Sequence, residues 1–185
     1  MPADVEYFHR MNRIQRRSRS LSLVCALLVF TLPDALALYW WWADASTLAV
    51  AAGLAAQAIA QPLLAWQRVM GFAVTAVPVG MVMLALWQAR QCFEEFARGE
   101  LFTGRAVRGL QRFSLWVVAS AGTGMLAQMA CSALLTWGNA PGTRQLTLSL
   151  TADVLFTLLF AAMVGVMAAV IAQAQALADD NAGFV

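Results

Sequence analysis

Four apolar runs of membrane-spanning length constrain this chain more than any other feature. They cover residues 21–42, 69–89, 113–136 and 150–172 of the 185. A helix of about 20 apolar residues crosses a hydrocarbon core about 30 Å thick. Transmembrane β-strands are instead segments of about 10 residues that alternate in polarity, and the sequence has no such alternation. We therefore predict an all-α integral membrane protein with these four runs as its spans.

The composition agrees with this class of protein. Hydrophobic residues make up 61% of the chain and charged residues 12%, with a mean hydropathy of +0.67. Roughly 25% of the residues in an ordinary soluble domain are charged, so about half of the usual ionic surface is missing. All 12 basic residues are Arg. Their positions therefore carry more information about topology than the net charge of +2 does.

The distribution of arginine favours four spans over five. Residues 45–67 carry no charge and are rich in Ala, so they are long enough to be a further span. With four spans, ten arginines face the cytosol and only Arg68 and Arg144 face outward; with five, the count is seven against five. Basic residues concentrate on the cytosolic side. We therefore predict a four-helix bundle, up-down-up-down, with both termini inside.

In this topology residues 45–67 form an additional external or interfacial helix between spans one and two. Gly53, Gln57 and Gln61 would form a polar stripe on it at i, i+4 spacing, and Pro62 interrupts its end. Whether the segment lies on the membrane or dips into it stays open. The other connecting parts are a basic cytosolic N-terminal segment (1–20), a cytosolic segment (90–112), an external loop (137–149) and a cytosolic tail (173–185).

Span one resembles a signal peptide at Ala35-Leu36-Ala37, which mimics a small-x-small cleavage site. The apolar run, however, continues into Tyr39-Trp40-Trp41-Trp42. Aromatic residues gather at membrane–water interfaces. We therefore retain this run as a mature span whose aromatic belt marks the outer interface.

The cytosolic segment is the only long interior stretch that is dense in charge. Glu94 and Arg98 have the i, i+4 spacing of a helical ion pair, and Gly99 would end that helix. Arg105, Arg108 and Arg112 then share one face of a second helix. Three aromatic residues would turn toward the bundle or the lipid: Phe93, Phe96 and Phe102. Two interpretations stay open, a partner-docking surface and a plain helical hairpin that extends spans two and three.

Two acidic residues, Asp34 and Asp153, fall within the predicted spans, at similar depth in the outer half. An acid at the centre of a membrane helix costs about 2.5–3.5 kcal/mol on insertion scales and usually faces a cavity or a partner. One hypothesis is a shared outward-facing polar cavity for a proton, a cation or a cationic ligand. The other is local capping, in which Asp153 helps to start span four beside Thr151.

No group of residues in the sequence resembles a catalytic site. Cys25, Cys92 and Cys131 lie far apart, there is one His, and metal sites need clustered ligands. A nucleophile–base pair and a Gly-rich phosphate loop are also missing. Three arginines close to the bilayer are too few for direct nucleic-acid binding. We predict a non-enzymatic protein without a metal or a cofactor.

The charged segment and the tail resemble a bacterial membrane family known as domain of unknown function 2975. The first similar motif comprises Phe93, Phe96, Gly99, Glu100, Leu101, Phe102, Thr103 and Leu110. The second comprises Ala176, Leu177, Asp179, Asp180, Asn181, Phe184 and Val185. The resemblance implies four spans with both motifs in the cytosol, but no activity. It also implies a helix-turn-helix regulator as a partner, because members are often encoded beside small regulators of this kind.

Two functions follow as hypotheses for a multi-pass protein of the bacterial inner membrane. The first is an accessory or signalling subunit that binds a cytosolic or membrane protein. Its binding residues would be Phe93, Phe96, Gly99, Phe102, Arg105, Arg108, Arg112, Asp179, Asp180 and Val185. The second is a small transporter, or a ligand or proton sensor, that uses Asp34 and Asp153. Small residues in spans three and four suit helix packing, within the chain or in a homodimer.

Overall fold

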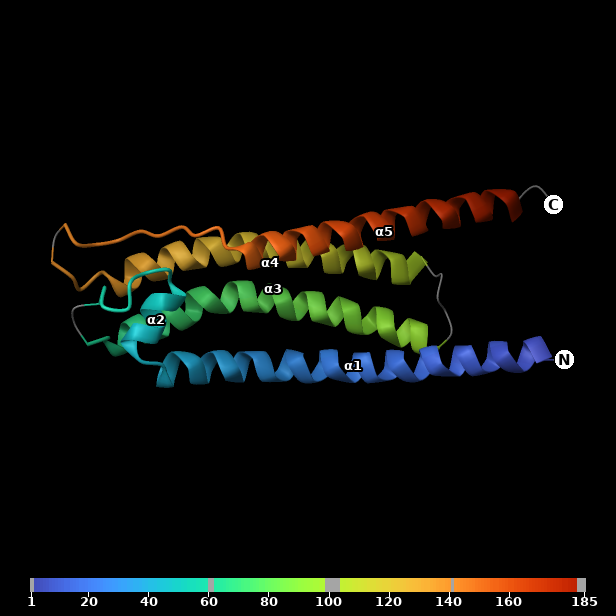
Figure 1. Cartoon of the computed structure of the whole chain (residues 1–185), viewed down its shortest axis with the longest axis horizontal. Helices are drawn as coiled ribbons and strands as arrows, with labels where there is room; N and C mark the ends of the chain where they lie inside the picture. Colours follow the sequence, from blue (N-terminus) through green and yellow to red (C-terminus); the bar gives the residue numbers. More distant parts are fainter. Residues whose placement is uncertain (1, 60–61, 99–103, 141, 183–185) are drawn as a thin grey trace. The chain divides into compact units, whose positions relative to one another are not determined.

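Five α-helices make up most of the part of the chain that the structure describes (Figure 1). The computed structural model describes the backbone of residues 2–59, 62–98, 104–140 and 142–182, and side chains within 15–177 of the same ranges. The helices are α1 (Pro2–Trp42), α2 (Ala45–Ala51), α3 (Ala65–Ala97), α4 (Gly104–Leu135) and α5 (Ala152–Ala182). These ranges contain no β-strand. All helices except α2 are long and apolar enough to cross a membrane, which confirms the all-α class and the four predicted spans.

The long helices exceed what a bilayer requires. Helix α3 has 33 residues and α4 has 32, which at 1.5 Å per residue is about 50 Å each. The hydrocarbon core is only about 30 Å thick. The charged end of α3 and the charged start of α4 therefore have enough length to extend beyond it.

Internal contacts divide the chain into two units, and every long helix contributes a segment to each. Unit 1 comprises residues 1–29, 83–117 and 159–185, and unit 2 comprises residues 30–82 and 118–158. Unit 1 contains the basic N-terminal segment, the charged segment and the tail. Unit 2 contains α2, the loop before α5 and both acids that the sequence places within spans.

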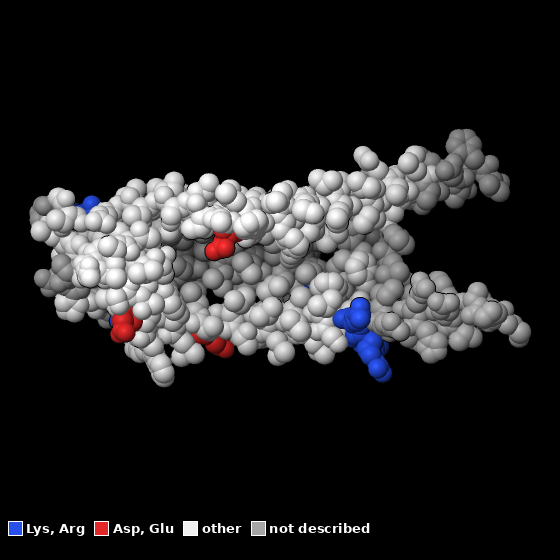
Figure 2. All heavy atoms as spheres, viewed as in Figure 1, with Lys and Arg blue, Asp and Glu red and all other residues white. Residues whose placement is uncertain are grey.

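The described surface has the character expected of a protein in lipid. Figure 2 shows charged atoms in only a few places on the face in view, with uncharged atoms between them. Large apolar side chains are exposed on several helices, among them Phe30 on α1 and Phe156 on α5, with exposed fractions of 70% and 69%. In water such a surface would promote aggregation, whereas in a bilayer it contacts acyl chains.

The core of unit 2 forms around Trp40 at the end of α1. Its side chain is 4% exposed and packs in a cluster with Leu48 and Ala49 of α2 and with Cys131 and Leu135 of α4. Its indole Nε1 donates a hydrogen bond of 2.8 Å to Thr75 Oγ1. The tryptophans of the predicted aromatic belt therefore differ in their exposure. Trp41 and Trp42 stay exposed, whereas Trp40 is a core residue because its ring and its N–H both find partners.

The helix between spans one and two is present but much shorter than the predicted 45–67. Helix α2 ends at Ala51, and Gly53 adopts a φ of +75°. The amide of Gly53 donates to the carbonyl of Val50 and that of Leu54 to the carbonyl of Ala49, both at 2.9 Å. This pair of bonds is a Schellman C-cap, and its left-handed position favours glycine. Gly53 therefore terminates the helix instead of contributing to a polar stripe along it.

The loop before α5 is held to the rest of unit 2 by side-chain hydrogen bonds. Thr147 Oγ1 donates to the carbonyl of Ala52 at 2.6 Å, and its amide donates to Ser132 Oγ at 3.0 Å. Asn139 Nδ2 donates to the carbonyl of Ala58 at 2.6 Å. These bonds satisfy backbone groups that lie outside the helices, so the loop and the segment after α2 stabilise each other.

In unit 1, α4 and α5 approach closely through small residues. Ser114 Oγ donates a 2.6 Å hydrogen bond to the carbonyl of Ala161, and Ala161 is fully buried. A Cβ on Gly165 would lie 3.0 Å from Ser114 Oγ. Small residues at such positions let membrane helices come together.

We expect Gly165→Leu to destabilise the protein by about 1–3 kcal/mol, because the new side chain overpacks this contact and displaces Ser114. Thermal unfolding in detergent measures the effect. Gly122→Leu on α4 is the matched control, because a Cβ there meets nothing within 4 Å. Equal losses of stability in the two variants would contradict the close contact between α4 and α5.

Candidate functional site

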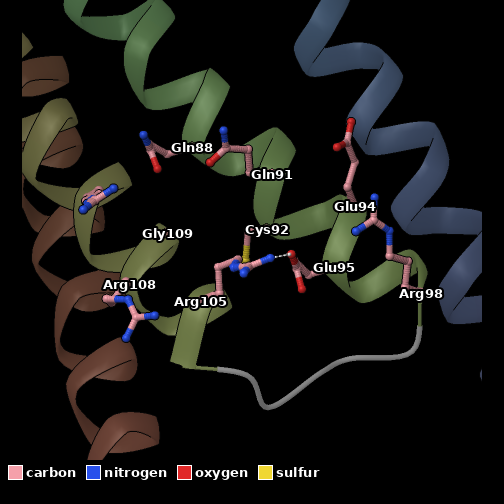
Figure 3. A pocket seen from close by; sticks show the side chains of 10 residues that line it. Gln88, Gln91, Cys92, Glu94, Glu95, Arg98, Arg105, Arg108 and Gly109 are labelled. Carbon is pink, nitrogen blue, oxygen red and sulfur yellow. Dashed lines mark ion pairs between the residues drawn. The ribbon is translucent and has the colours of Figure 1, made fainter.

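The charged ends of α3 and α4 enclose a cavity of about 290 Å³ in unit 1 (Figure 3). Most of its lining residues carry polar or charged side chains. The residues are Gln88, Gln91, Cys92, Glu94, Glu95, Arg98, Arg105, Arg108, Gly109 and Arg112. We call this the arginine cavity, because four arginines line it together with two glutamates.

Close packing of the two helices fixes the floor of the arginine cavity. A Cβ on Gly109 would lie 3.7 Å from the carbonyl oxygen of Gln88 and 3.8 Å from Cys92 Cβ. Cys92 Sγ donates a weak hydrogen bond of 3.7 Å to the carbonyl of Ala106. Both contacts join α3 to α4. They therefore hold the cavity-lining side chains of α3 at a fixed distance from those of α4.

Glu95 is the buried charge of the site. The residue is only 8% exposed, and its Oε1 lies 3.6 Å from Nη1 of Arg105, whose side chain is 80% exposed. Figure 3 shows Arg105 reaching from α4 toward Glu95 on α3. A buried carboxylate requires a partner, whereas an exposed ion pair of this length is weak. Glu95 therefore has Arg105 as its ion-pair partner among the described side chains.

Glu94 points away from that pair and binds elsewhere. Its Oε1 accepts a 2.8 Å bond from Arg90 Nε and a 3.3 Å bond from Ser22 Oγ of α1. The predicted pairing of Glu94 with Arg98 is therefore wrong, because Glu94 pairs with Arg90, one turn before it on α3. Arg90 is fixed for this role because its guanidinium also stacks over Trp87, 5.3 Å from the ring centroid.

The structure brings together the three arginines that the sequence places on one helix face. Arg105, Arg108 and Arg112 all line the arginine cavity and all are exposed. Neither Arg108 nor Arg112 forms an ion pair with a carboxylate of the described side chains. Within the described part of the chain, both guanidinium groups are therefore exposed cations without a paired carboxylate.

The other predicted partner-binding residues do not join this cavity in the described structure. Phe93 and Phe96 are half-buried and pack edge to face, with ring centroids 6.5 Å apart. They do not line the cavity. Five further predicted positions lie outside the described side chains: Gly99, Phe102, Asp179, Asp180 and Val185.

The sequence reasoning missed the contribution of α3 to the arginine cavity. Gln88, Gln91, Glu95 and Arg98 line it alongside the arginines of α4. Their spacing of three and four residues is the signature of one helix face. This spacing can be recognised in the sequence. The burial of Glu95 cannot, because it depends on contact with α4 and not on neighbouring residues.

The two acids in the predicted spans do not line the arginine cavity. Asp34 and Asp153 are both exposed. Neither acid lines the cavities of about 220, 200 and 260 Å³ found among the described residues of unit 2. Asp153 lies in the first turn of α5, and the amides of Val154 and Leu155 bond to the carbonyl of Thr151. A negative charge in this first turn is favourable near the positive end of the helix.

The chemistry of the arginine cavity suits an anion. Guanidinium groups bind carboxylates and phosphates through paired N–H donors, and arginine does not coordinate metal ions. Among the described residues, no group of three His, Cys, Asp or Glu side chains is placed to hold a metal. The three cysteines are free and buried, one each in α1, α3 and α4.

Four apolar helices of spanning length are typical of a multi-pass membrane protein, and two of them, α3 and α4, line an arginine-rich cavity. The chain belongs to a family of proteins of unknown function, DUF2975, which it matches over residues 51–183. The match includes the whole of α3, α4 and α5 and the whole arginine cavity. No curated protein and no solved structure matches the chain.

Proposed function

We propose that this protein is a non-enzymatic accessory or signalling subunit of the bacterial inner membrane that binds a protein partner at the arginine cavity. The observation that carries the proposal is the convergence of Arg98, Arg105, Arg108 and Arg112 on one cavity with a buried Glu95. A plain helical hairpin needs no such arrangement, since its charges are solvated separately.

The length of the helices supports exposure of this cavity to water. Because α3 and α4 are each about 50 Å long, their charged ends extend past the apolar core of about 30 Å. The bias of arginine toward the same side supports a cytosolic location. A soluble partner, or the cytosolic part of a membrane partner, then has access to the site.

The partner that fits is one that presents an acidic segment. Arg108 and Arg112 are exposed and lack a described carboxylate partner. A carboxylate that reaches into the cavity gains bidentate hydrogen bonds and complements its excess positive charge. The chain's own residues 173–185 contain Asp179 and Asp180, and we include this tail in the partner-binding surface.

We expect Arg108→Ala combined with Arg112→Ala to abolish partner binding while leaving folding intact, because both side chains are exposed. Losing two charge-assisted contacts of about 1.5–3 kcal/mol each would weaken binding at least about 100-fold. The measurement is purification from native membranes in mild detergent, followed by mass spectrometry of the proteins that remain bound.

The matched control is Arg16→Ala combined with Arg19→Ala, which removes the same charge from exposed positions of α1 in unit 1. This variant should keep a stoichiometric partner that the first variant loses. The proposal fails if both variants retain the same partner, or if the wild-type protein carries lipid alone. A chain that stops before Asp179 tests separately whether the tail contributes.

A further inference from the structure

Unit 2 contains an apolar groove between α1 and α3 that ends at a single charged residue. Its volume is about 200 Å³, and its lining is Ala37, Trp40, Trp41, Arg68, Val69 and Phe72. Pockets for drug-sized ligands usually measure about 300–1,000 Å³. The groove is therefore too small to enclose a metabolite, but it is large enough for part of one hydrocarbon chain.

Arg68 is held rigidly at the end of the groove by the last carbonyls of α1. Its Nη1 donates to the carbonyls of Trp40, Trp41 and Ala43 at 2.6, 3.0 and 3.2 Å. These bonds satisfy acceptors that the helix leaves without an intrahelical partner. The guanidinium is thus fixed in one orientation before any ligand arrives.

The other side of this guanidinium remains free. Arginine has five N–H donors, and only those on Nη1 are used here. In the described part of the chain, Nε and Nη2 of Arg68 have no hydrogen-bond partner. Their three N–H groups form the planar edge that pairs with two oxygens of a phosphate.

The position of Arg68 matches the phosphate level of a bilayer. It directly precedes the apolar run 69–89 of α3. At the facing end of α1, Trp41 and Trp42 are 70% and 79% exposed, as residues of an interfacial aromatic belt are. An apolar groove that starts at this boundary opens to acyl chains, with a positive charge where their head groups lie.

We propose that this groove is a phospholipid-binding site. One acyl chain lies against Ala37, Val69 and Phe72, and the lipid phosphate accepts hydrogen bonds from Nε and Nη2 of Arg68. Phospholipid is the occupant that combines an apolar chain with an anionic group at this depth. The site is separate from the arginine cavity, so it stands whether or not a protein partner binds there.

Native mass spectrometry of the detergent-purified protein with added phosphatidylglycerol tests the proposal. Ala37→Leu fills the groove without touching Arg68, and Ala35→Leu is its control, because Ala35 is exposed on the same helix but does not line the groove. We expect Ala37→Leu to weaken lipid binding by about tenfold or more, and Ala35→Leu to bind like the wild type. Equal melting temperatures of the two variants would exclude misfolding as the cause.

The contribution of the phosphate is tested on the wild-type protein alone. Diacylglycerol with the same chains lacks the phosphate and should bind about tenfold more weakly than phosphatidylglycerol. Equal binding of the two lipids would overturn the role of Arg68. Unchanged lipid binding by Ala37→Leu would overturn the groove as the lipid-binding site. A lipid-free dimer that Ala37→Leu dissociates would also overturn it, because the occupant of the groove would then be a second copy of the chain.

Discussion

Gly71→Ala is expected to destabilise the protein by about 3 kcal/mol or more, at the upper end of overpacking effects. A Cβ at this position would overlap the six-membered part of the Trp40 ring, with three ring carbons closer than 3.0 Å, whereas carbon atoms pack at about 3.5–4.0 Å. Trp40 cannot move aside without loss, because it is buried in the core of unit 2 and donates a hydrogen bond to Thr75. Thermal or denaturant-induced unfolding in detergent measures the change.

Helix α3 supplies its own control in Gly80→Ala. A Cβ on Gly80 meets nothing within 4 Å, so this variant should be neutral or stabilising by up to about 1 kcal/mol through helix propensity. A second check is Gly71→Ala combined with Trp40→Leu, which removes the ring that the new methyl group strikes. The two changes should be coupled by about 1–3 kcal/mol. Additive effects would show that Trp40 does not limit the space at Gly71.

The membrane-spanning helices are the part of the fold that the sequence predicts best. The length of each apolar run must match the thickness of the bilayer, and this constraint can be recognised from one chain alone. The predicted runs 21–42 and 69–89 lie wholly within α1 and α3, and the other two overrun α4 and α5 only at Thr136, Leu150 and Thr151. The shared face of Arg105, Arg108 and Arg112 was also predictable, since helical periodicity determines it.

Features that depend on contacts between helices were not predictable in this way. The sequence predicts Trp40 as part of an interfacial belt. In the structure its ring instead packs against Gly71, which has no side chain, and belongs to the core of unit 2. The Ala-rich segment 45–67 looks helical throughout, yet a left-handed Gly53 ends the helix. Glu95 resembles the other charges of its segment, and only the approach of α4 buries it.

The two arginines that the charge count assigns to the outer side both have structural partners in unit 2. Arg68 binds the terminal carbonyls of α1, and Arg144 stacks over Trp137 with its guanidinium 4.8 Å from the ring centroid. The two arginines that the prediction places on the side with few positive charges are thus held by local interactions. The two interactions differ in strength, however, since cation–π contacts at exposed sites are worth about 0.5–1 kcal/mol.

Arg68→Met is expected to destabilise the protein by about 2–3 kcal/mol. The change keeps much of the apolar stem but removes the hydrogen bonds to the carbonyls of Trp40, Trp41 and Ala43, and bonds to charged groups contribute about 1.5–3 kcal/mol each in favourable cases. It also removes a positive charge from the negative end of the α1 dipole. Unfolding should be measured in detergent depleted of phospholipid, so that any lipid bound at Arg68 does not contribute.

Arg144→Met is the comparison that isolates the cap from the loss of charge. It removes one arginine from the same unit, but only a single exposed stacking contact is lost, so the expected change is below about 1 kcal/mol. Arg68→Lys should fall between the two, because an ammonium keeps the charge at the helix end but lacks the planar fork of donors. If Arg68→Met and Arg144→Met unfolded at the same temperature, the carbonyl contacts of Arg68 would contribute nothing to stability, and α1 would end at Trp42 for other reasons.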